Sequence, residues 1–303
     1  MCFNPLEFMT NTYAFLLLVL LGFLITPNRS CGQTSLDYAY LNYTLLPTAD
    51  FKEAANGTSL SHLEMNLLTP TLQLSKKTKV NSVLYYRFSS YNYDFETSYL
   101  PSQLHEIRYT FLTRHTFNSN WELLFVPRCN IRSDFKEQMS LKDFFPAASA
   151  ILMKSSQKDA HFKWGFGVNY NNDLDKNSVL PILALNYTNQ NVRLSAFLPN
   201  NASIAFLSTK KIEYGLAFQS DPVIIHNQST DSVSYLKTLN VHCSATFSYN
   251  IGANIWLNSK AGWVGFRNYD VLDASFQTPN DAFDSELSSS AFVQLGLSLR
   301  SKE

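Results

Sequence analysis

The sequence predicts an all-β protein, an antiparallel transmembrane β-barrel of twelve to fourteen strands. Three observations lead to this prediction. Apolar and polar residues alternate over runs long enough to cross a membrane as strands. Long and short connections take turns along the chain. Charged residues make up 16% of the chain and aromatic residues 14%, whereas soluble proteins carry about 25% charged residues.

The clearest strands form a predicted hairpin between Leu104 and Ile131. From His105 to Phe117 most alternate residues are apolar or aromatic, and the interleaved residues are polar or charged apart from Leu112. The alternation resumes at Trp121, after Asn118-Ser119-Asn120. A period of two means a strand with two unlike faces, and the break predicts a tight turn. Aromatic residues on one face and charges on the other indicate lipid outside and a polar lumen inside.

Strand-like runs with turn signals between them fill the chain from Gln33 onward, and no long stretch has a helical period. Alternation is clear in Phe162–Tyr170, Ile212–Phe218 and Ala291–Leu299. The predicted strands are 35–46, 59–74, 79–90, 103–117, 121–133, 141–153, 160–171, 179–188, 191–198, 203–208, 211–219, 234–249, 253–267 and 288–300.

The connections provide an independent test of this architecture. Long ones at 47–58, 91–102, 134–140, 172–178, 220–233 and 268–287 take turns with short ones at 75–78, 118–120, 154–159, 189–190, 209–210 and 250–252. The one exception is the short link Pro199-Asn200-Asn201. Outer-membrane barrels have long loops on one side and short turns on the other. An even count of fourteen fits, but the runs within 191–208 are short, and twelve strands result if some of them are bends.

Residues 1–32 are interpreted as a signal peptide and residues 33–303 as the barrel domain. Ala14–Ile25 is an unbroken apolar run of signal-peptide length, and Ser30-Cys31-Gly32 supplies small residues for cleavage before Gln33. Lipidation at Cys31 is the alternative. The predicted location is the cell outer membrane. Basic and acidic residues are equal in number, so no basic field points to nucleic acid.

A soluble β-sandwich or lipocalin-like ligand-binding barrel is the structural alternative. Its interior would be apolar, so the aromatic face would point inward and the Arg and Glu face toward water. Alternation alone does not separate the two architectures. Strand length, the asymmetry of the connections and the signal peptide favour the membrane barrel.

Short motifs in the second half of the chain resemble a known family. They are Trp164-Gly165-Phe166-Gly167, then Leu180-Pro181 opening one strand, Leu198-Pro199 closing another, and Glu213-Tyr214-Gly215-Leu216. Together they resemble a family of uncharacterised outer-membrane β-barrel proteins from Bacteroidota, classed as a domain of unknown function. The resemblance covers roughly Gln33 to Arg300 and implies an outer-membrane barrel, without a reaction or substrate. The final strand of an outer-membrane barrel usually ends on an aromatic residue, whereas here Leu299 is followed by Arg300.

The search for catalytic or metal-binding chemistry yields no site. The six histidines lack metal-ligand spacing, and no nucleophile-elbow, phosphate-loop or dinucleotide motif is present. No cofactor is expected. His105 and His115 lie near the two ends of one strand, where interfacial positions explain them. A barrel-embedded lipid-modifying enzyme would need a His and a nearby Ser on one strand face at the lipid boundary. His242 and Ser244 have that spacing. Cys129 continues an apolar face and is interpreted as a free thiol.

The most specific candidate site is a set of charged residues on the predicted hairpin. If the turn is centred on Ser119, Glu106 faces Arg132, Thr110 faces Arg128 and Arg114 faces Leu124. One interpretation is a charge network that satisfies itself and holds the strand register. The other is a basic constriction that selects anionic solutes. The residues are Glu106, Arg108, Arg114, Glu122, Arg128 and Arg132.

These inferences predict an outer-membrane protein without enzymatic activity, either a small-solute channel or a structural envelope protein. Its expected partners are outer-membrane lipid, lipopolysaccharide and the barrel-assembly machinery. An acidic stretch, Asn268–Leu287, suggests cation binding near lipopolysaccharide, but its spacing is not that of a calcium loop and a solvated loop explains it. Oligomeric state and solute do not follow from the sequence.

Overall fold

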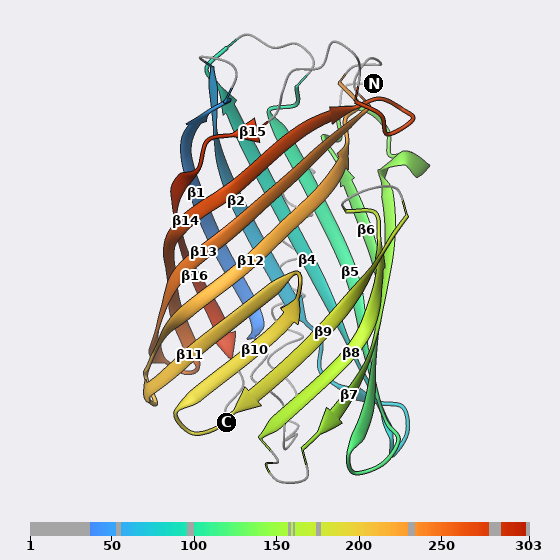
Figure 1. The fold of residues 1–303 in the computed structure, drawn as a ribbon, viewed down its shortest axis with the longest axis vertical. Coiled ribbons are helices and arrows are strands. Elements are labelled where there is room, and N and C mark those ends of the chain that lie inside the picture. Colours follow the sequence, from blue (N-terminus) through green and yellow to red (C-terminus); the bar gives the residue numbers. More distant parts are fainter. Residues whose placement is uncertain are drawn as a thin grey trace, which may run out of the picture. The chain divides into compact units, whose positions relative to one another are not determined.

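The structure is a computed structural model that describes residues 37–52, 56–95, 100–156, 159, 161–173, 177–229, 234–278 and 286–300. The predicted signal peptide and Cys31 lie outside these residues. Fourteen long strands are described (Figure 1): β1 (Asp37–Asp50), β2 (Gly57–Leu68), β4 (Thr78–Tyr93), β5 (Gln103–Thr116), β6 (Trp121–Ser133), β7 (Phe144–Ser155), β8 (Phe162–Asn171), β9 (Ser178–Thr188), β10 (Val192–Leu198), β11 (Asn201–Thr209), β12 (Ile212–His226), β13 (Tyr235–Gly252), β14 (Ile255–Leu272) and β16 (Ser290–Arg300). Short pieces are β3 (Leu72–Gln73), β15 (Glu286–Leu287) and a 3₁₀ turn, η1 (Leu141–Asp143).

The fourteen strands pair antiparallel in sequence order and close into a barrel. Pairing of β16 with both β14 and β1 completes the ring. The predicted fold class is therefore confirmed, and the count is fourteen because β10 and β11 are separate, paired strands. None of the described helices is long and apolar enough to span a membrane.

Several strand boundaries differ from the prediction, each for a local reason. The predicted run 59–74 breaks after Leu68, because Pro70 cannot donate to the ladder. Strand β7 begins at Phe144 rather than at residue 141, because Ser140 and Asp143 form a capping box that turns the chain. Strand β12 extends to His226, past the point where the alternation of its sequence is lost.

The direction of the two strand faces excludes the soluble alternative. On β5, Tyr109 and Phe111 lie on the outer face and are 40% and 44% exposed. Glu106 and Arg132, on the opposite face, are each 1% exposed. Aromatic residues outside and charges inside are the arrangement of a barrel in lipid.

The glycines of the Trp-Gly-Phe-Gly motif have a packing reason. Gly165 and Gly167 lie opposite Met153 and Ile151 of β7. A Cβ atom at Gly167 would lie 2.1 Å from the carbonyl oxygen of Ala150, and one at Gly165 would lie 2.5 Å from that of Leu152. Only glycine allows the two strands this close approach.

Buried apolar side chains pack together inside the barrel at the end that carries the long loops. Inward-facing residues of this end form an apolar cluster, so the inner face changes from polar to apolar along the barrel. We call this cluster the apolar closure: Leu46, Ala49, Phe51, Leu60, Tyr91, Leu100, Leu104, Val223, Ile225, Leu236, Val264, Tyr269, Val271, Leu287 and Phe292.

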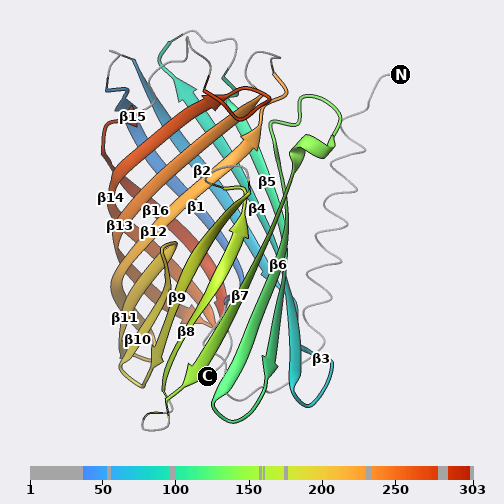
Figure 2. The same cartoon turned by 45° about the vertical axis from the view of Figure 1, so that its right-hand side comes forward.

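The wall is not of even height. The β10–β11 hairpin ends below the neighbouring strands β9 and β12 (Figure 2). Above it, β12 meets β6 in a single parallel bridge, His226 with Ser133. The long-loop end is thus enclosed by fewer strands than the short-turn end.

Candidate functional site: a charged layer above a polar chamber

A buried carboxylate forms the centre of the charge network. Glu106 Oε1 accepts hydrogen bonds from Arg108 Nη2 at 2.7 Å and from Arg132 Nε at 3.0 Å. Its Oε2 accepts one from Arg87 Nη2 at 2.7 Å. The register is the predicted one, with Glu106 opposite Arg132 across the β5–β6 hairpin. Three guanidinium groups therefore converge on one carboxylate.

Two further carboxylates balance these charges. Arg87 Nη1 donates to Asp221 of β12 at 2.5 Å, and Arg132 Nη1 donates to Asp173, beyond β8, at 2.6 Å. The three arginines thus face three acids. Arg87, Asp173 and Asp221 were missed by the sequence analysis, because the hairpin register relates only β5 to β6. Arg87 lies on β4, the strand before the hairpin, and the two acids come from elements farther along the chain. The layer fits a network that satisfies itself better than it fits a purely basic ring.

The remaining predicted members lie apart from this layer. Arg114 and Lys163 approach Glu122 at 3.9 and 3.1 Å near the short-turn end. Arg128 pairs with Thr110, as predicted. Its Nη2 donates to Asn169 Oδ1 at 2.8 Å.

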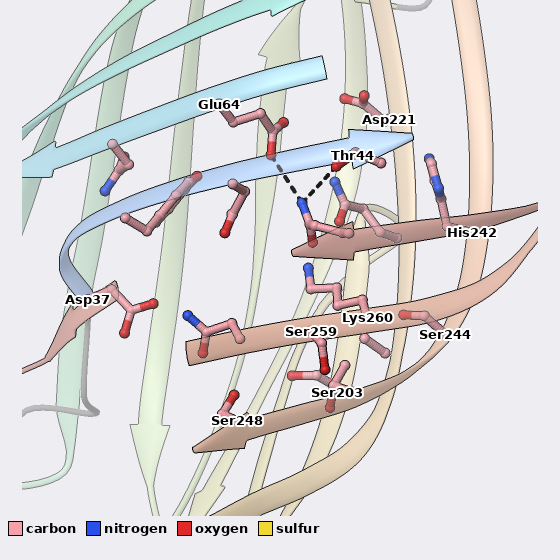
Figure 3. Close-up of a pocket in the computed structure, with 18 of the residues that line it drawn as sticks. Asp37, Thr44, Glu64, Ser203, Asp221, His242, Ser244, Ser248, Ser259 and Lys260 are labelled. Atoms are coloured by element: carbon pink, nitrogen blue, oxygen red, sulfur yellow. Dashed lines mark hydrogen bonds between the residues drawn. The ribbon is translucent and has the colours of Figure 1, made fainter. Parts of the chain in front are cut away.

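Below the charged layer the lumen holds a polar chamber of about 580 Å³. Its wall is rich in hydroxyl and amide groups from β1, β2, β11–β14 and β16. Figure 3 shows Lys260 and Glu64 projecting into it from different strands. Gln294 Nε2 donates to Thr44 Oγ1 at 3.0 Å and to Glu64 Oε2 at 3.5 Å.

A second ionic layer lines the chamber toward the short turns. Arg300 donates to Glu213 at 2.7 Å and forms an ion pair with Asp37 at 2.9 Å. Its guanidinium carbon lies 4.4 Å from the ring centroid of Trp256. Arg193 approaches Glu213 at 3.6 Å. Two arginines and two acids again balance.

The inner wall nevertheless keeps an excess of positive charge. Arg128, Lys260 and Arg267 face inward, and none has a carboxylate oxygen within 4.0 Å among the described residues. Glu64 is an inward carboxylate without a basic nitrogen within that distance in the described part of the chain. Three unpaired cations against one unpaired acid make the interior favourable for anions.

The His242–Ser244 pair is not where an enzyme of the lipid boundary would need it. Both residues line the chamber, whereas a lipid-modifying enzyme would need the pair at the lipid boundary. His105 and His115 do lie on the outer side of β5, where Tyr86 and Thr78 contact their Nδ1 atoms at 2.9 Å. Among the described residues, no three metal-binding side chains are arranged around one point.

The acidic stretch and the cysteines have simple explanations where they are described. Asp270 lies 3.5 Å from Lys237, and Glu286 forms an ion pair with Lys52. Asp281 and Asp284 lie outside the described residues. Cys129 and Cys243 are free, exposed thiols.

A hydrogen-bonded latch joins two segments at the long-loop end. Asp143 of η1 accepts from His226 Nδ1 at 2.7 Å and from the Ser140 backbone N–H at 2.5 Å. Burial by itself would raise the pKa of the Asp143 carboxyl, but the Ser140 N–H, His226 and Ser133 together lower this pKa below its ordinary value of 3.8.

Comparisons with known proteins find one family and several solved structures of low sequence identity. A family model described as Domain of unknown function (DUF6268) matches residues 29–300. No curated protein matches the sequence. The chain is similar to an outer-membrane channel from Pseudomonas putida F1, with TM-score 0.42, 10% identity and coverage of 91% of this chain and 100% of that one. It is also similar to the P. putida toluene transporter TodX, with TM-score 0.39, 8% identity and coverage of 88% of this chain and 89% of that one. A third similar structure is outer membrane phospholipase A from Escherichia coli, with TM-score 0.34, 11% identity and coverage of 87% of this chain and 92% of that one.

Proposed function

The chain belongs to this family of unknown function, and we propose that it is a channel-type protein of the outer membrane that takes small anionic solutes into its chamber. The observation behind the proposal is the polar chamber, whose lining includes five arginine and lysine side chains against four carboxylates. A barrel that served only as a structural element could fill its lumen with packed side chains. Here a volume of about 580 Å³ stays free below the charged layer.

The apolar closure implies that passage is gated. Solute entering from the short-turn side reaches Arg87 and Asp221 and then meets buried hydrophobic residues. A charged solute cannot cross this apolar layer without rearrangement, because burying an unpaired charge is costly. We therefore expect a low open probability rather than a permanently open pore.

The remaining features of the proposal concern the cellular setting. Residues 1–32 would direct export, the barrel-assembly machinery would insert the chain, and lipid and lipopolysaccharide would surround it. The sequence resemblance supports a source in Bacteroidota. A non-enzymatic role is supported by the chamber position of His242 and Ser244.

Planar bilayers under a KCl gradient test the proposal. The purified protein should show intermittent currents with a reversal potential on the anion side. Lys260→Glu should lower the ratio of anion to cation permeability by at least about fivefold, because a unit charge at 4 Å contributes about 1 kcal/mol in a water-like medium and the substitution reverses that charge. Lys211→Glu, in an exposed turn, is the matched control and should change nothing. Absence of currents, or equal effects of the two variants, would overturn the proposal.

A further inference from the structure

Two strands of the barrel wall have edges that no ladder covers within the described part of the chain. The β9–β10 ladder ends at Leu183 with Leu198, so Val179–Ile182 has no described ladder partner on that side. The β11–β12 ladder ends at Asn201 with Gln219 and is followed by a bond from the Ser220 N–H to the Asn200 carbonyl. Asp221–Ile225 therefore has no described ladder partner on its facing side. We call the interval between these two edges the seam (Figure 1).

Both edges carry a proline at the position where a donor would point into the seam. The Asn189 N–H points from β9 toward β10, and the Ser220 N–H points from β12 toward the hairpin turn. Because backbone donors alternate in direction along a strand, the donors of residues 181 and 222 would also point into the seam. Both residues are proline. Proline at an edge prevents strand pairing, so the sequence itself keeps the two edges apart.

Side chains rather than a strand ladder close the seam near the long loops. The parallel bridge between His226 and Ser133 and the 2.7 Å contact of His226 with Asp143 hold β12 there. Ile224 packs in an apolar cluster with Phe145 and Tyr235. Separating β12 from these groups would break no continuous series of backbone hydrogen bonds. In contrast, parting any other neighbouring pair of long strands would break several consecutive backbone hydrogen bonds.

An apolar groove lies on the outer face at the foot of the seam. Its volume is about 530 Å³, and small residues from β11 and β13 form part of its lining. Ala202 of this groove pairs with Phe218, close to the point where the β11–β12 ladder ends. A groove of this kind suits an unbranched hydrocarbon chain. Its outward-facing residues include Leu194, Ala202, Ile204, Leu216, Phe218 and Ala245.

Polar groups without partners lie on the inner side, beside the β9 edge. Asn169 pairs directly with Leu180 of that edge and is 2% exposed. Its Oδ1 accepts from Arg128 at 2.8 Å and from Ser149 at 2.7 Å, which fixes the orientation of the amide. Asn169 Nδ2 and Arg128 Nε are buried donors without a hydrogen-bond partner among the described residues. An anionic acceptor would satisfy both donors and would neutralise the guanidinium of Arg128.

We propose that the seam is a lateral portal for an acidic single-chain amphiphile. The hydrocarbon chain lies in the outer groove, and the acidic headgroup passes through the seam to Arg128 and Asn169. This function is separate from solute entry into the chamber, because the groove faces the membrane.

Photolabelling in nanodiscs of phosphatidylcholine tests the portal, with a diazirine-bearing palmitate as the probe. Labelled peptides should map to β9–β13 at about fivefold or more above β1, β2 and β16. Arg128→Gln should reduce this labelling about tenfold, the effect of losing a charge-assisted hydrogen bond. Ala245→Phe, which fills the groove, should also reduce it.

The controls separate binding from misfolding and from channel function. Ala291→Phe adds the same ring to the outer face of β16, at an exposed position, and should leave the labelling unchanged. Each variant must retain its heat-modifiable migration on gels. A photoactivatable lysophosphatidylcholine, whose headgroup is zwitterionic, should label β9–β13 no more than the rest of the wall. Uniform labelling by the palmitate, or labelling indifferent to Arg128→Gln, would overturn the portal, whatever the currents show.

Discussion

Replacing Glu106 by Gln removes the one carboxylate shared by three arginines. Arg87 and Arg132 would keep Asp221 and Asp173 as partners, so Arg108 would be the guanidinium left without a carboxylate. Its side chain is 28% exposed, which places the effect near the lower end of the 3–5 kcal/mol typical of a broken buried pair. We expect the free energy of unfolding to fall by about 3 kcal/mol.

The same hairpin offers a matched control. Glu122 lies on the same lumen face, but its partners Lys163 and Arg114 are 32% and 31% exposed. Such pairs contribute about 0–1 kcal/mol, so Glu122→Gln should have little effect. Adding Arg108→Met to Glu106→Gln should restore part of the lost stability, because it removes the uncompensated charge.

Urea titration of the protein in phosphatidylcholine vesicles measures these differences, with tryptophan fluorescence and the heat-induced gel shift as two readouts. A difference between Glu106→Gln and Glu122→Gln of less than about 1 kcal/mol would refute the reasoning. In that case the buried layer would contribute no more than an exposed ion pair does.

Two further predictions concern the wall and the latch. Gly167→Ala should lower the free energy of unfolding by about 1–3 kcal/mol through overpacking against Ala150. Gly265→Ala is the control and should be neutral, because nothing lies within 4 Å of the added Cβ. Equal urea midpoints for the two variants would contradict the packing argument. Because the folded-state pKa of Asp143 is lowered, its contribution is present above the ordinary carboxyl pKa of 3.8 and is lost as the pH falls through the lower folded-state value. Asp143→Asn should therefore destabilise the barrel at pH 7 but not at the acidic end of a pH series of gel-shift temperatures, and a pH-independent difference would count against the latch.

Local pattern was sufficient to predict the strands and the hairpin register. Glu106 opposite Arg132 follows from a turn centred on Ser119, because hairpin register depends only on the turn and the alternation. The division of β5 into an aromatic face and a charged face followed from the same alternation, whereas the choice of the charged face as the inner one needed the strand lengths and the connections as well. The position of the turn and the alternation of residues are both visible within a few neighbouring residues of the sequence.

The complete charged layer could not be predicted, because Asp221 and Asp173 meet its arginines only in the folded barrel. Asp221 lies on β12 and Asp173 beyond β8, and no spacing links them to Arg87 or Arg132. The apolar closure did leave a signal. Val223-Ile224-Ile225 is apolar on both strand faces, which a strand between lipid and a polar lumen does not need. Both faces of that segment are buried, one in the closure and the other against Phe145.

Arg300 links three strands that are far apart along the chain. It is the last residue of β16, yet it neutralises Asp37 at the start of β1 and Glu213 at the start of β12. Without its guanidinium, Glu213 would keep Arg193 at 3.6 Å, whereas Asp37 would have no basic nitrogen within 4.0 Å among the described residues. The side chain of Arg300 therefore ties the two strands that close the barrel, β1 and β16, to the opposite wall of the lumen.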